Sequence, residues 1–280
     1  MSDRYRVRVL CEVGGVSRSG YYKFQHSRAD VGAKDLELVA QIRQVQGRVM
    51  QTYGYRRMKM ALESEYAISA NTKRIARLQK EHQLQAHIRR KRSTMSPMVF
   101  AVPEGPKPNI LGRDFHATEP DRKWVTDITT VQVGAQRLYV SAVMDLFNRE
   151  IVSYGISANI ALPLVLKSLE DASAIRRPKT VLVHSDQGGH YTSPSYCNLL
   201  RNHNAIQSMS RKGNCLDNAS MECFFGHFKS ELINRLKPCS RQELEDSIHS
   251  YVLFYNTRRI QTKIKTAPVA YRSRFVQTVS

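Results

Sequence analysis

The chain has 280 residues, and its 43 lysines and arginines against 24 aspartates and glutamates give a formal net charge of +19. This excess is far larger than solubility requires, so it indicates a polyanionic partner and favours nucleic acid over a merely solvated basic surface. The length exceeds that of a usual single domain and favours a catalytic core with one or two smaller modules. The first hundred residues hold 20 basic and eight acidic side chains, so this part is the most positive.

The cysteines and the hydropathy exclude several classes of protein. Five cysteines, an odd number without a CxxC pair, argue against a disulfide framework and against a zinc ribbon. The sequence has no run of about 18 apolar residues and does not open with a charged leader before an apolar core. We therefore expect a soluble cytoplasmic protein with no membrane partner.

Helical patterns occupy the beginning of the chain. Residues 8–24 predict two short helices separated by Gly14 and Gly15, with Ser17 as the cap of the second helix. Residues 33–49 predict a separate helix, because their apolar side chains recur with helical spacing. We expect this third helix to serve packing.

Residues 53–84 carry the strongest indication of DNA recognition. A helix over about residues 56–65, a short turn, and a second helix that begins at residue 71 or 72 form a helix-turn-helix pattern. The second helix has one apolar face and one row of cations, as in helices that enter a DNA groove. An ordinary amphipathic surface helix is the alternative, and the net charge favours DNA. The predicted DNA contacts of this helix are Lys73, Arg74, Arg77 and Lys80.

The stretch from residue 87 to residue 109 reads as a linker, because a basic cluster is followed by four prolines and a glycine. We expect the basic cluster to follow a phosphate backbone, a plain solvated tether being the alternative. The cluster consists of Arg89, Arg90, Lys91 and Arg92.

The second half of the chain changes to alternating strand and helix patterns. Three strand patterns in succession predict an antiparallel meander, and two further strands alternate with helices. This order predicts a mixed α/β sheet with helices on its faces, in which the fourth strand lies beside the first. The predicted strands cover residues 124–132, 136–146, 149–157, 180–186 and 205–210, and the predicted helices cover residues 161–177 and 193–203.

Two aspartates occupy chemically informative positions in this sheet. Asp127 lies in the middle of an apolar, threonine-rich strand, where an ionised carboxylate is costly unless it is paired or binds a metal. A structural, hydrogen-bonding aspartate is the alternative. Asp186 lies where the fourth strand ends, at the edge where open sheets present ligands. Adjacent first and fourth strands would bring the two carboxylates together, and such a pair requires a cation.

The stretch CLDNASMECFFGHFKSEL, which begins at Cys215, reads as one helix with two possible metal sites. Cys215, Cys223 and His227 suggest zinc, but no fourth ligand has a suitable spacing. Glu222, in contrast, is a candidate third carboxylate for the site of the two aspartates.

Helical spacing sorts the polar residues of this stretch. Asn218, Glu222, Gly226 and Lys229 fall on one face of the helix, which we expect to meet the metal site and DNA. Asp217 is expected to cap the helix at its beginning. The phenylalanines are expected to pack in the core.

Three motifs together carry a family resemblance. WVTDIT, HSDQGGHYTSPSY and SMSRKGNCLDNASMECFFGHFKSEL resemble, in this order, the DDE motif of IS3 family insertion-sequence transposases, whose catalytic core is retroviral integrase-like. The 35 residues between Asp186 and Glu222 match the spacing typical of that family. GVSRSGYYKF, YGYRRM and FYNTRRIQTKIKTAPVAY resemble its other segments, so essentially the whole chain is covered. Gln261 replaces a frequent histidine, as in the IS150-like subgroup.

The resemblance implies a fold and a division of the chain. It implies an RNase H-like mixed five-stranded sheet flanked by helices and preceded by an all-α helix-turn-helix region. We expect a short N-terminal helical segment, a helix-turn-helix region, a basic proline-rich linker, and a catalytic domain with C-terminal helices, with boundaries at 1–30, 31–95, 96–118 and 119–280.

The resemblance also implies a metal site. In this family pattern Asp127, Asp186 and Glu222 hold two Mg²⁺ or Mn²⁺ ions. Phosphodiester transfer benefits from two hard cations because one activates the attacking oxygen and the other neutralises the leaving oxygen. Lys229 resembles the DNA-contacting lysine of the family. The predicted DNA contacts in the catalytic part are Arg211, Lys212, Asn218, Lys229, Arg258 and Arg259.

The implied function is metal-dependent 3′-end cleavage and strand transfer of insertion-sequence DNA. The implied partners are the terminal inverted repeats, target DNA, a second or further copy of the chain, and the product of an upstream reading frame, fused or associated. The expected location is the bacterial cytoplasm, at the nucleoid. A non-catalytic end-binding repressor and an RNase H-like nuclease without strand transfer are the alternatives, and the intact triad argues against the repressor.

Overall fold

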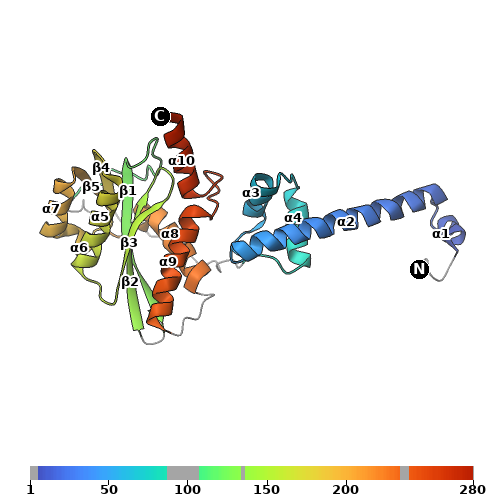
Figure 1. Ribbon diagram of the computed structural model, residues 1–280, viewed down its shortest axis with the longest axis horizontal. Coiled ribbons are helices and arrows are strands. Elements are labelled where there is room, and N and C mark those ends of the chain that lie inside the picture. The colour runs from blue at the N-terminus through green and yellow to red at the C-terminus, as the bar shows by residue number, and fades with distance from the viewer. Residues whose placement is uncertain (1–5, 87–106, 134–135, 234–239, 280) are drawn as a thin grey trace. The chain divides into compact units, whose positions relative to one another are not determined.

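The computed structural model describes residues 6–86, 107–133, 136–233 and 240–279, and it divides the chain into two compact units, Met1–Ala86 and His87–Ser280 (Figure 1). Within these ranges no helix combines the length and the apolar composition needed to cross a membrane. The basic cluster predicted to follow DNA, Arg89 to Arg92, lies outside the described residues.

The first unit is all α. Its helices are α1 (Val7–Val13), α2 (Arg18–Arg48), α3 (Tyr55–Tyr66) and α4 (Thr72–Glu81). Ser17 caps α2 as predicted, since its side chain accepts a hydrogen bond from the backbone N–H of Gly20 at 3.0 Å. The prediction of two separate helices after Ser17 is wrong, because α2 continues for 31 residues and crosses the expected boundary at residue 30. No proline interrupts this stretch, and its three isolated glycines, at positions 20, 32 and 47, are weak helix breakers.

The predicted helix-turn-helix is confirmed as α3 and α4. Ala67 adopts a left-handed conformation that ends α3, and the Asn71 side chain caps α4 by accepting from the backbone N–H of Lys73 at 2.8 Å. The core of the unit forms where α3 and α4 bury one face each against α2. The fully buried apolar side chains are Ile42, Val45, Met58, Ala61, Leu62 and Ile75.

The second unit contains a five-stranded sheet in the order β3-β2-β1-β4-β5. β1 is antiparallel to β2 and parallel to β4, which confirms the predicted mixed sheet and the predicted neighbours of the first strand. The strands are β1 (Lys123–Val133), β2 (Gln136–Asp145), β3 (Ile151–Ser157), β4 (Val181–Ser185) and β5 (Ala205–Met209).

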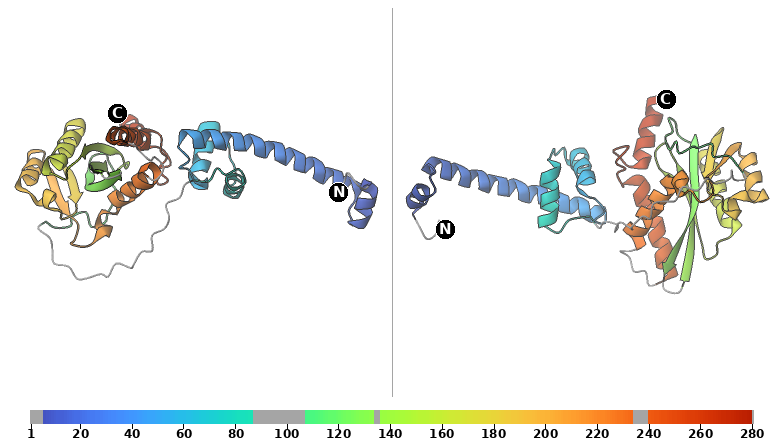
Figure 2. Two further views of the ribbon diagram at one scale, coloured as in Figure 1. Left: turned by 90° about the horizontal axis from the view of Figure 1, so that it is seen from below. Right: turned by 180° about the vertical axis from the view of Figure 1, so that it is seen from behind.

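Helices cover both faces of this sheet. α5, α6 and α7 lie on one side and α8 and α9 on the other, as the views in Figures 1 and 2 agree. Side chains alternate between the faces along a strand, so Trp124 joins the core under α5 and α7 whereas Asp127, three residues later, lies on the side of α8. The helices are α5 (Leu162–Arg176), α6 (Gly189–Thr192), α7 (Pro194–Asn202), α8 (Ala219–Phe228), α9 (Arg241–Thr257) and α10 (Pro268–Val279), with a 3₁₀ turn at Cys215–Asn218 and a π turn at Lys229–Ile233.

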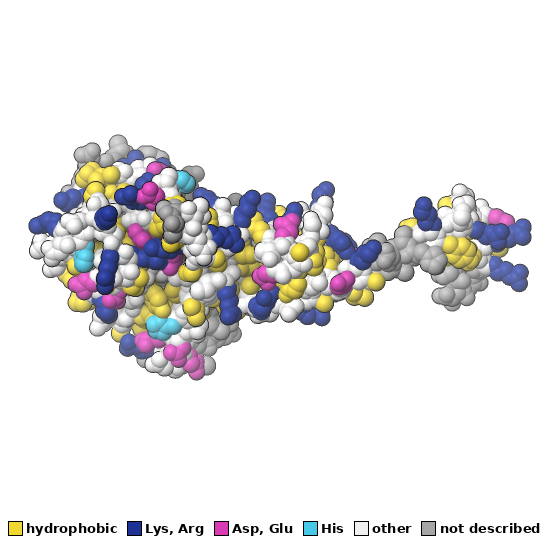
Figure 3. Space-filling model, turned by 45° about the horizontal axis from the view of Figure 1, so that its top comes forward, with side chains coloured by type: hydrophobic (Ala, Val, Ile, Leu, Met, Phe, Trp, Pro, Cys, Tyr) yellow, Lys and Arg dark blue, Asp and Glu magenta, His cyan; other side chains and the backbone are white. Residues whose placement is uncertain are grey.

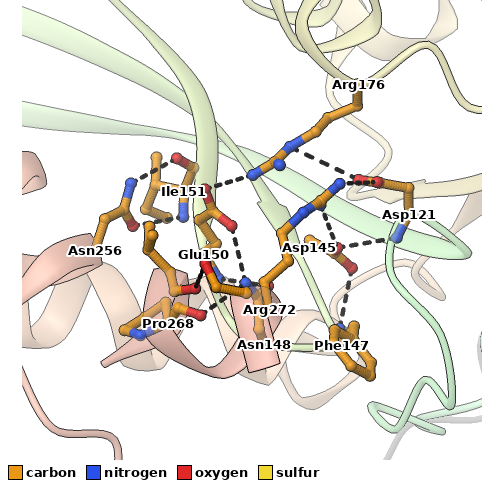
Figure 4. Close-up of polar contacts among 12 residues, drawn as sticks. Asp121, Asp145, Phe147, Asn148, Glu150, Ile151, Arg176, Asn256, Pro268 and Arg272 are labelled. Atoms are coloured by element: carbon orange, nitrogen blue, oxygen red, sulfur yellow. Dashed lines mark hydrogen bonds and ion pairs between the residues drawn. The ribbon is translucent and has the colours of Figure 1, made fainter. Parts of the chain in front are cut away.

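An ionic network fastens the C-terminal helix to the end of the sheet where β1 begins (Figure 4). Arg272 of α10 lies 3.0 Å from Asp121 and 4.0 Å from Asp145, and Arg176 of α5 forms an ion pair with Glu150. Asp145 has no exposed surface, and burial raises its pKa to about 7. The network therefore joins elements far apart in sequence through charges that burial would penalise if they lacked partners.

Candidate active site

Three carboxylates from separate elements line one cavity of about 410 Å³ in the second unit. Asp127 comes from the middle of β1, Asp186 directly follows β4, and Glu222 lies in the first turn of α8. The parallel pairing of β1 with β4 brings the two aspartates to the same region of the sheet, and α8 packs on β1. The structure thus brings together the three residues predicted to form the catalytic site.

The aspartates are held by backbone hydrogen bonds. Asp127 Oδ1 accepts from the N–H of Ile128 at 2.8 Å, and Asp186 Oδ1 accepts from the N–H of Gly188 at 2.9 Å. A Cβ on Gly188 would lie only 3.0 Å from Asp186 Oδ1, so a side chain at this position would crowd the carboxylate. Sequence reasoning did not assign a role to Gly188, although it lies in one of the family motifs.

The electrostatics of the cavity indicate unbalanced negative charge. Burial raises the pKa of Asp127, and the charges of Asp186 and Glu222 raise it further, to about 7. The N–H of Ile128 and the charge of Lys229 act in the opposite direction. A carboxylate in this position is stabilised in its ionised form by a nearby cation.

The donor set of the cavity fits Mg²⁺ or Mn²⁺, because carboxylate and amide oxygens suit hard divalent cations. Asn218 also lines the cavity, and its buried Oδ1 has no hydrogen-bond partner among the described residues. As they stand, no three His, Cys, Asp or Glu side chains in the described ranges are close enough together to hold a metal ion. Asp186 and Glu222 are exposed, so ion binding requires the three carboxylates to come closer together.

The zinc alternative gains no support from this region. Cys223 is exposed on α8, and His227 Nδ1 lies 3.6 Å from Glu231 Oε1. The side chain of Cys215 lies outside the described residues. The oxygen-lined cavity is therefore the better metal site.

Asp217 anchors the loop between β5 and α8. Its carboxylate is fully buried and accepts from Arg211 Nε at 2.9 Å, Arg113 Nε at 2.7 Å and Asn109 Nδ2 at 3.0 Å. Hydrogen bonds from Arg211 and Arg113 hold the pKa of Asp217 well below its usual range. The prediction that Asp217 caps α8 is wrong, because its carboxylate receives these side chains instead and the 3₁₀ turn leads into the helix.

Two of the predicted DNA contacts lie on that anchored loop. Arg211 and Lys212 are exposed and line the same cavity as the three carboxylates. Asn218, another predicted contact, is 5% exposed, and its Nδ2 donates to the carbonyl of Thr126 at 3.2 Å. This bond ties the beginning of α8 to β1 beside Asp127, so Asn218 orients the helix that carries Glu222.

Arg259 does not reach the surface, and its prediction as a DNA contact is wrong. Its side chain has no exposed surface, and it donates to Glu231 at 2.6 Å through Nη2 and at 2.8 Å through Nε. Tyr251 also donates to Glu231, at 3.0 Å. This cluster binds the C-terminal signature to the π turn that follows α8 and carries Lys229. Arg258, its neighbour, is exposed.

The helix-turn-helix presents its cations in two ways. Arg74 and Arg77 lie 2.7 Å and 2.6 Å from the carboxylate of Asp35 on α2, so part of their charge is balanced within the unit. Lys73 and Lys80 are exposed and have no ion-pair partner in the part of the chain that the structure describes. Figure 3 shows that lysine and arginine side chains are spread over both units among the acidic ones.

His184 supports the end of β4 from inside the core. It is fully buried, with Nδ1 2.9 Å from Ser208 Oγ and Nε2 3.0 Å from Ser210 Oγ. Burial lowers its pKa to about 4. The residue therefore shapes the strand end before Asp186.

Comparison with known protein families agrees with this architecture. Residues 33–92 match an HTH-like domain, and residues 117–215 and 222–275 match the integrase core domain. The simian T-cell lymphotropic virus intasome in complex with the PP2A regulatory subunit B56 gamma is similar in fold alone. The TM-score is 0.52 and the identity 13%, with 76% of this chain and 74% of that chain covered. This likeness confirms the predicted integrase-core, RNase H-like fold.

Two relatives from Escherichia coli strain K12 extend the comparison over most of the chain. The putative transposase InsK for insertion sequence element IS150 is 42% identical over 225 residues, which cover 79% of this chain and 77% of that protein. The transposase InsF for insertion sequence IS3A is 32% identical over 257 residues, covering 89% and 86%. The chain therefore belongs to the IS3 family of insertion-sequence transposases, with an HTH-like domain before its integrase core.

Proposed function

We propose that this transposase cleaves the 3′ ends of its element and joins them to a second phosphodiester in a metal-dependent reaction. The observation that supports this proposal is the gathering of Asp127, Asp186 and Glu222 in one cavity whose rim carries Arg211 and Lys212. Three carboxylates provide oxygen ligands for divalent cations, and the two cationic side chains attract the phosphates of a DNA strand.

Asp127, Asp186 and Glu222 would hold two Mg²⁺ or Mn²⁺ ions, which supply activation of the attacking oxygen and neutralisation of the leaving oxygen. The protein positions these carboxylates through the backbone bonds of the two aspartates and through Asn218, which fixes α8 on β1. Lys229 lies near enough to lower the pKa of Asp127, so we propose that it holds a phosphate of the bound strand.

The proposed reaction has two steps of the same type. In the first step, water attacks the phosphodiester at the end of the element, one P–O bond forms, and the bond to the 3′ oxygen breaks to leave a 3′-OH. In the second step, that 3′-OH attacks another phosphodiester, so one P–O bond again replaces another. Both steps take place at the three carboxylates, since each needs an activated oxygen and a stabilised leaving oxygen.

We assign recognition of the element's ends to the helix-turn-helix and to the basic cluster that follows it. Lys73 and Lys80 supply exposed charge, and Arg74 and Arg77 adjoin them on α4. Arg258 and the cluster from Arg89 to Arg92 are further proposed phosphate contacts. Because an element has two ends, we propose that a dimer or larger assembly acts on them, together with any product of the upstream reading frame.

The decisive experiment uses a duplex that carries the terminal repeat flanking the gene, with a preformed 3′-OH, incubated with Mg²⁺ and target DNA. Joined product supports the proposed function. An uncut duplex is tested in parallel. Cleavage of this duplex without joining indicates a nuclease, and binding without either reaction indicates a repressor. Asp127→Asn serves as the inactive control.

A further inference from the structure

A second cavity adjoins the one that holds the three carboxylates. Its volume is about 360 Å³, and its lining includes Lys107 and Asn109 from the segment before β1. Ser210 and Arg211 line both cavities, so the two form neighbouring compartments along one surface. The proposed function gives no role to Lys107 or to this second cavity.

The wall of the second cavity is held in place by the edge strand of the sheet. The backbone N–H of Met209 donates to the carbonyl of Pro108 at 3.2 Å, and the N–H of Leu111 donates to Ser208 Oγ at 3.0 Å. Asn109 Nδ2 donates to the buried carboxylate of Asp217 at 3.0 Å. These contacts fix the segment next to Lys107, so a ligand meets a preformed compartment and does not have to order it.

The two compartments differ in charge. The first is lined by three carboxylates as well as Arg211 and Lys212, whereas the described lining of the second includes Lys107 and Arg211 and no carboxylate. Lys107 is exposed and has no ion-pair partner among the described residues. Arg211 forms an ion pair with Asp217, which balances its charge. Lys107 is therefore the side chain that gives the second compartment a net positive charge.

We propose that the second compartment is a phosphate subsite for the DNA strand that is cut or joined. The strand whose reacting phosphodiester lies at the carboxylates continues past Arg211 and places a neighbouring phosphate against Lys107. A lysine ammonium suits this task because it meets a backbone phosphate as a point charge without reading the base. The inference rests on the proposed function, and it adds the path of the strand on one side of the reacting bond.

The test compares Lys107→Gln with Lys179→Gln, a matched loss of charge at an exposed lysine that precedes β4 and has no ion-pair partner among the described residues. The DNA is the end duplex with flanking sequence, in which single phosphodiesters on either side of the reacting bond are replaced by neutral methylphosphonates. Cleavage and joining rates are measured for each combination of protein and DNA.

One methylphosphonate position should slow the wild-type protein by roughly three- to tenfold, as expected for the loss of about one phosphate contact. Lys107→Gln should show a loss of similar size on unmodified DNA and no further loss at that position. Lys179→Gln should behave as the wild type does. The position found identifies on which side of the reacting bond the strand enters the subsite.

A binding measurement without divalent ions separates this inference from the proposed function. The slope of log affinity against log salt should be shallower for Lys107→Gln by about 0.9, the contribution of one phosphate of duplex DNA. A protein that binds but neither cuts nor joins ends would refute the proposed function while this slope still tests the subsite. If Lys107→Gln matches Lys179→Gln in slope and in every methylphosphonate series, the subsite is refuted.

Discussion

The two units of the chain use charged side chains in opposite ways. On α4, Lys73 and Lys80 stay exposed without ion-pair partners among the described residues. In the integrase core, Asp186 and Glu222 gather with Asp127 in one cavity, and their charges raise the pKa of Asp127. The proposed DNA binding requires positive charge toward phosphate, whereas the proposed chemistry requires negative charge that would hold metal ions. Substitutions should therefore remove one activity and spare the other.

The largest expected effect is on catalysis. Asp127→Asn or Glu222→Gln changes a proposed metal ligand, so cleavage should fall by about a thousandfold or more, as for residues that act as one catalytic unit. Binding of the terminal repeat, measured by fluorescence anisotropy, should stay within about twofold because the exposed cations are unchanged. Full cleavage by either variant would refute the assignment of the triad.

Arg259 should affect stability before it affects DNA. Arg259→Gln leaves Glu231 buried without its main partner, which costs about 3 to 5 kcal/mol in the free energy of unfolding. Arg258→Gln is the matched surface control and should change stability by less than about 0.5 kcal/mol. Urea unfolding measures both. If Arg259→Gln weakened DNA binding while stability stayed at the wild-type level, the result would support a direct contact between Arg259 and DNA.

Asp217 makes the stability of the core depend on pH. Its folded-state pKa lies below the ordinary value of 3.8, so its contribution is complete above that pH and is lost as the pH falls toward the folded value. Asp217→Asn should cost about 1 to 3 kcal/mol near neutral pH. The difference from the wild type should shrink below pH 3.8, and the exposed Asp246→Asn is measured beside it as the surface control. A constant difference would contradict the buried ion pairs.

The smallest effects concern the recognition helix. Lys80→Gln and Arg77→Gln should each flatten the salt dependence of end binding by a slope of about 0.9. Arg77→Gln should weaken affinity more than Lys80→Gln, since it also leaves Asp35 less compensated near the bound phosphates. Cleavage of a saturating amount of bound DNA should continue in both variants. An unchanged slope in both would place α4 away from DNA.

The prediction of the sheet succeeded because its signals are local. Alternating β-branched and aromatic residues followed by turn residues marked each strand, and the order of strands and helices left β1 beside β4. The break predicted within α2 is wrong, because no strong helix-breaking residue marks it. The predicted helices in residues 8–24 and 33–49 are separate, whereas the chain between them contains no proline and the helix continues.

The sequence by itself determined the family, the order of the elements and the three carboxylates, because motif spacing and side-chain period are properties of the chain. Only the tertiary structure decided the state of each charge. Arg259 and Lys80 both read as cations available to DNA, yet one is buried against Glu231 and the other is exposed. Asp217 likewise accepts hydrogen bonds from two residues, Asn109 and Arg113, that lie about a hundred positions earlier in the sequence. Burial and long-range pairing depend on which distant segments pack together, and no local pattern encodes that contact.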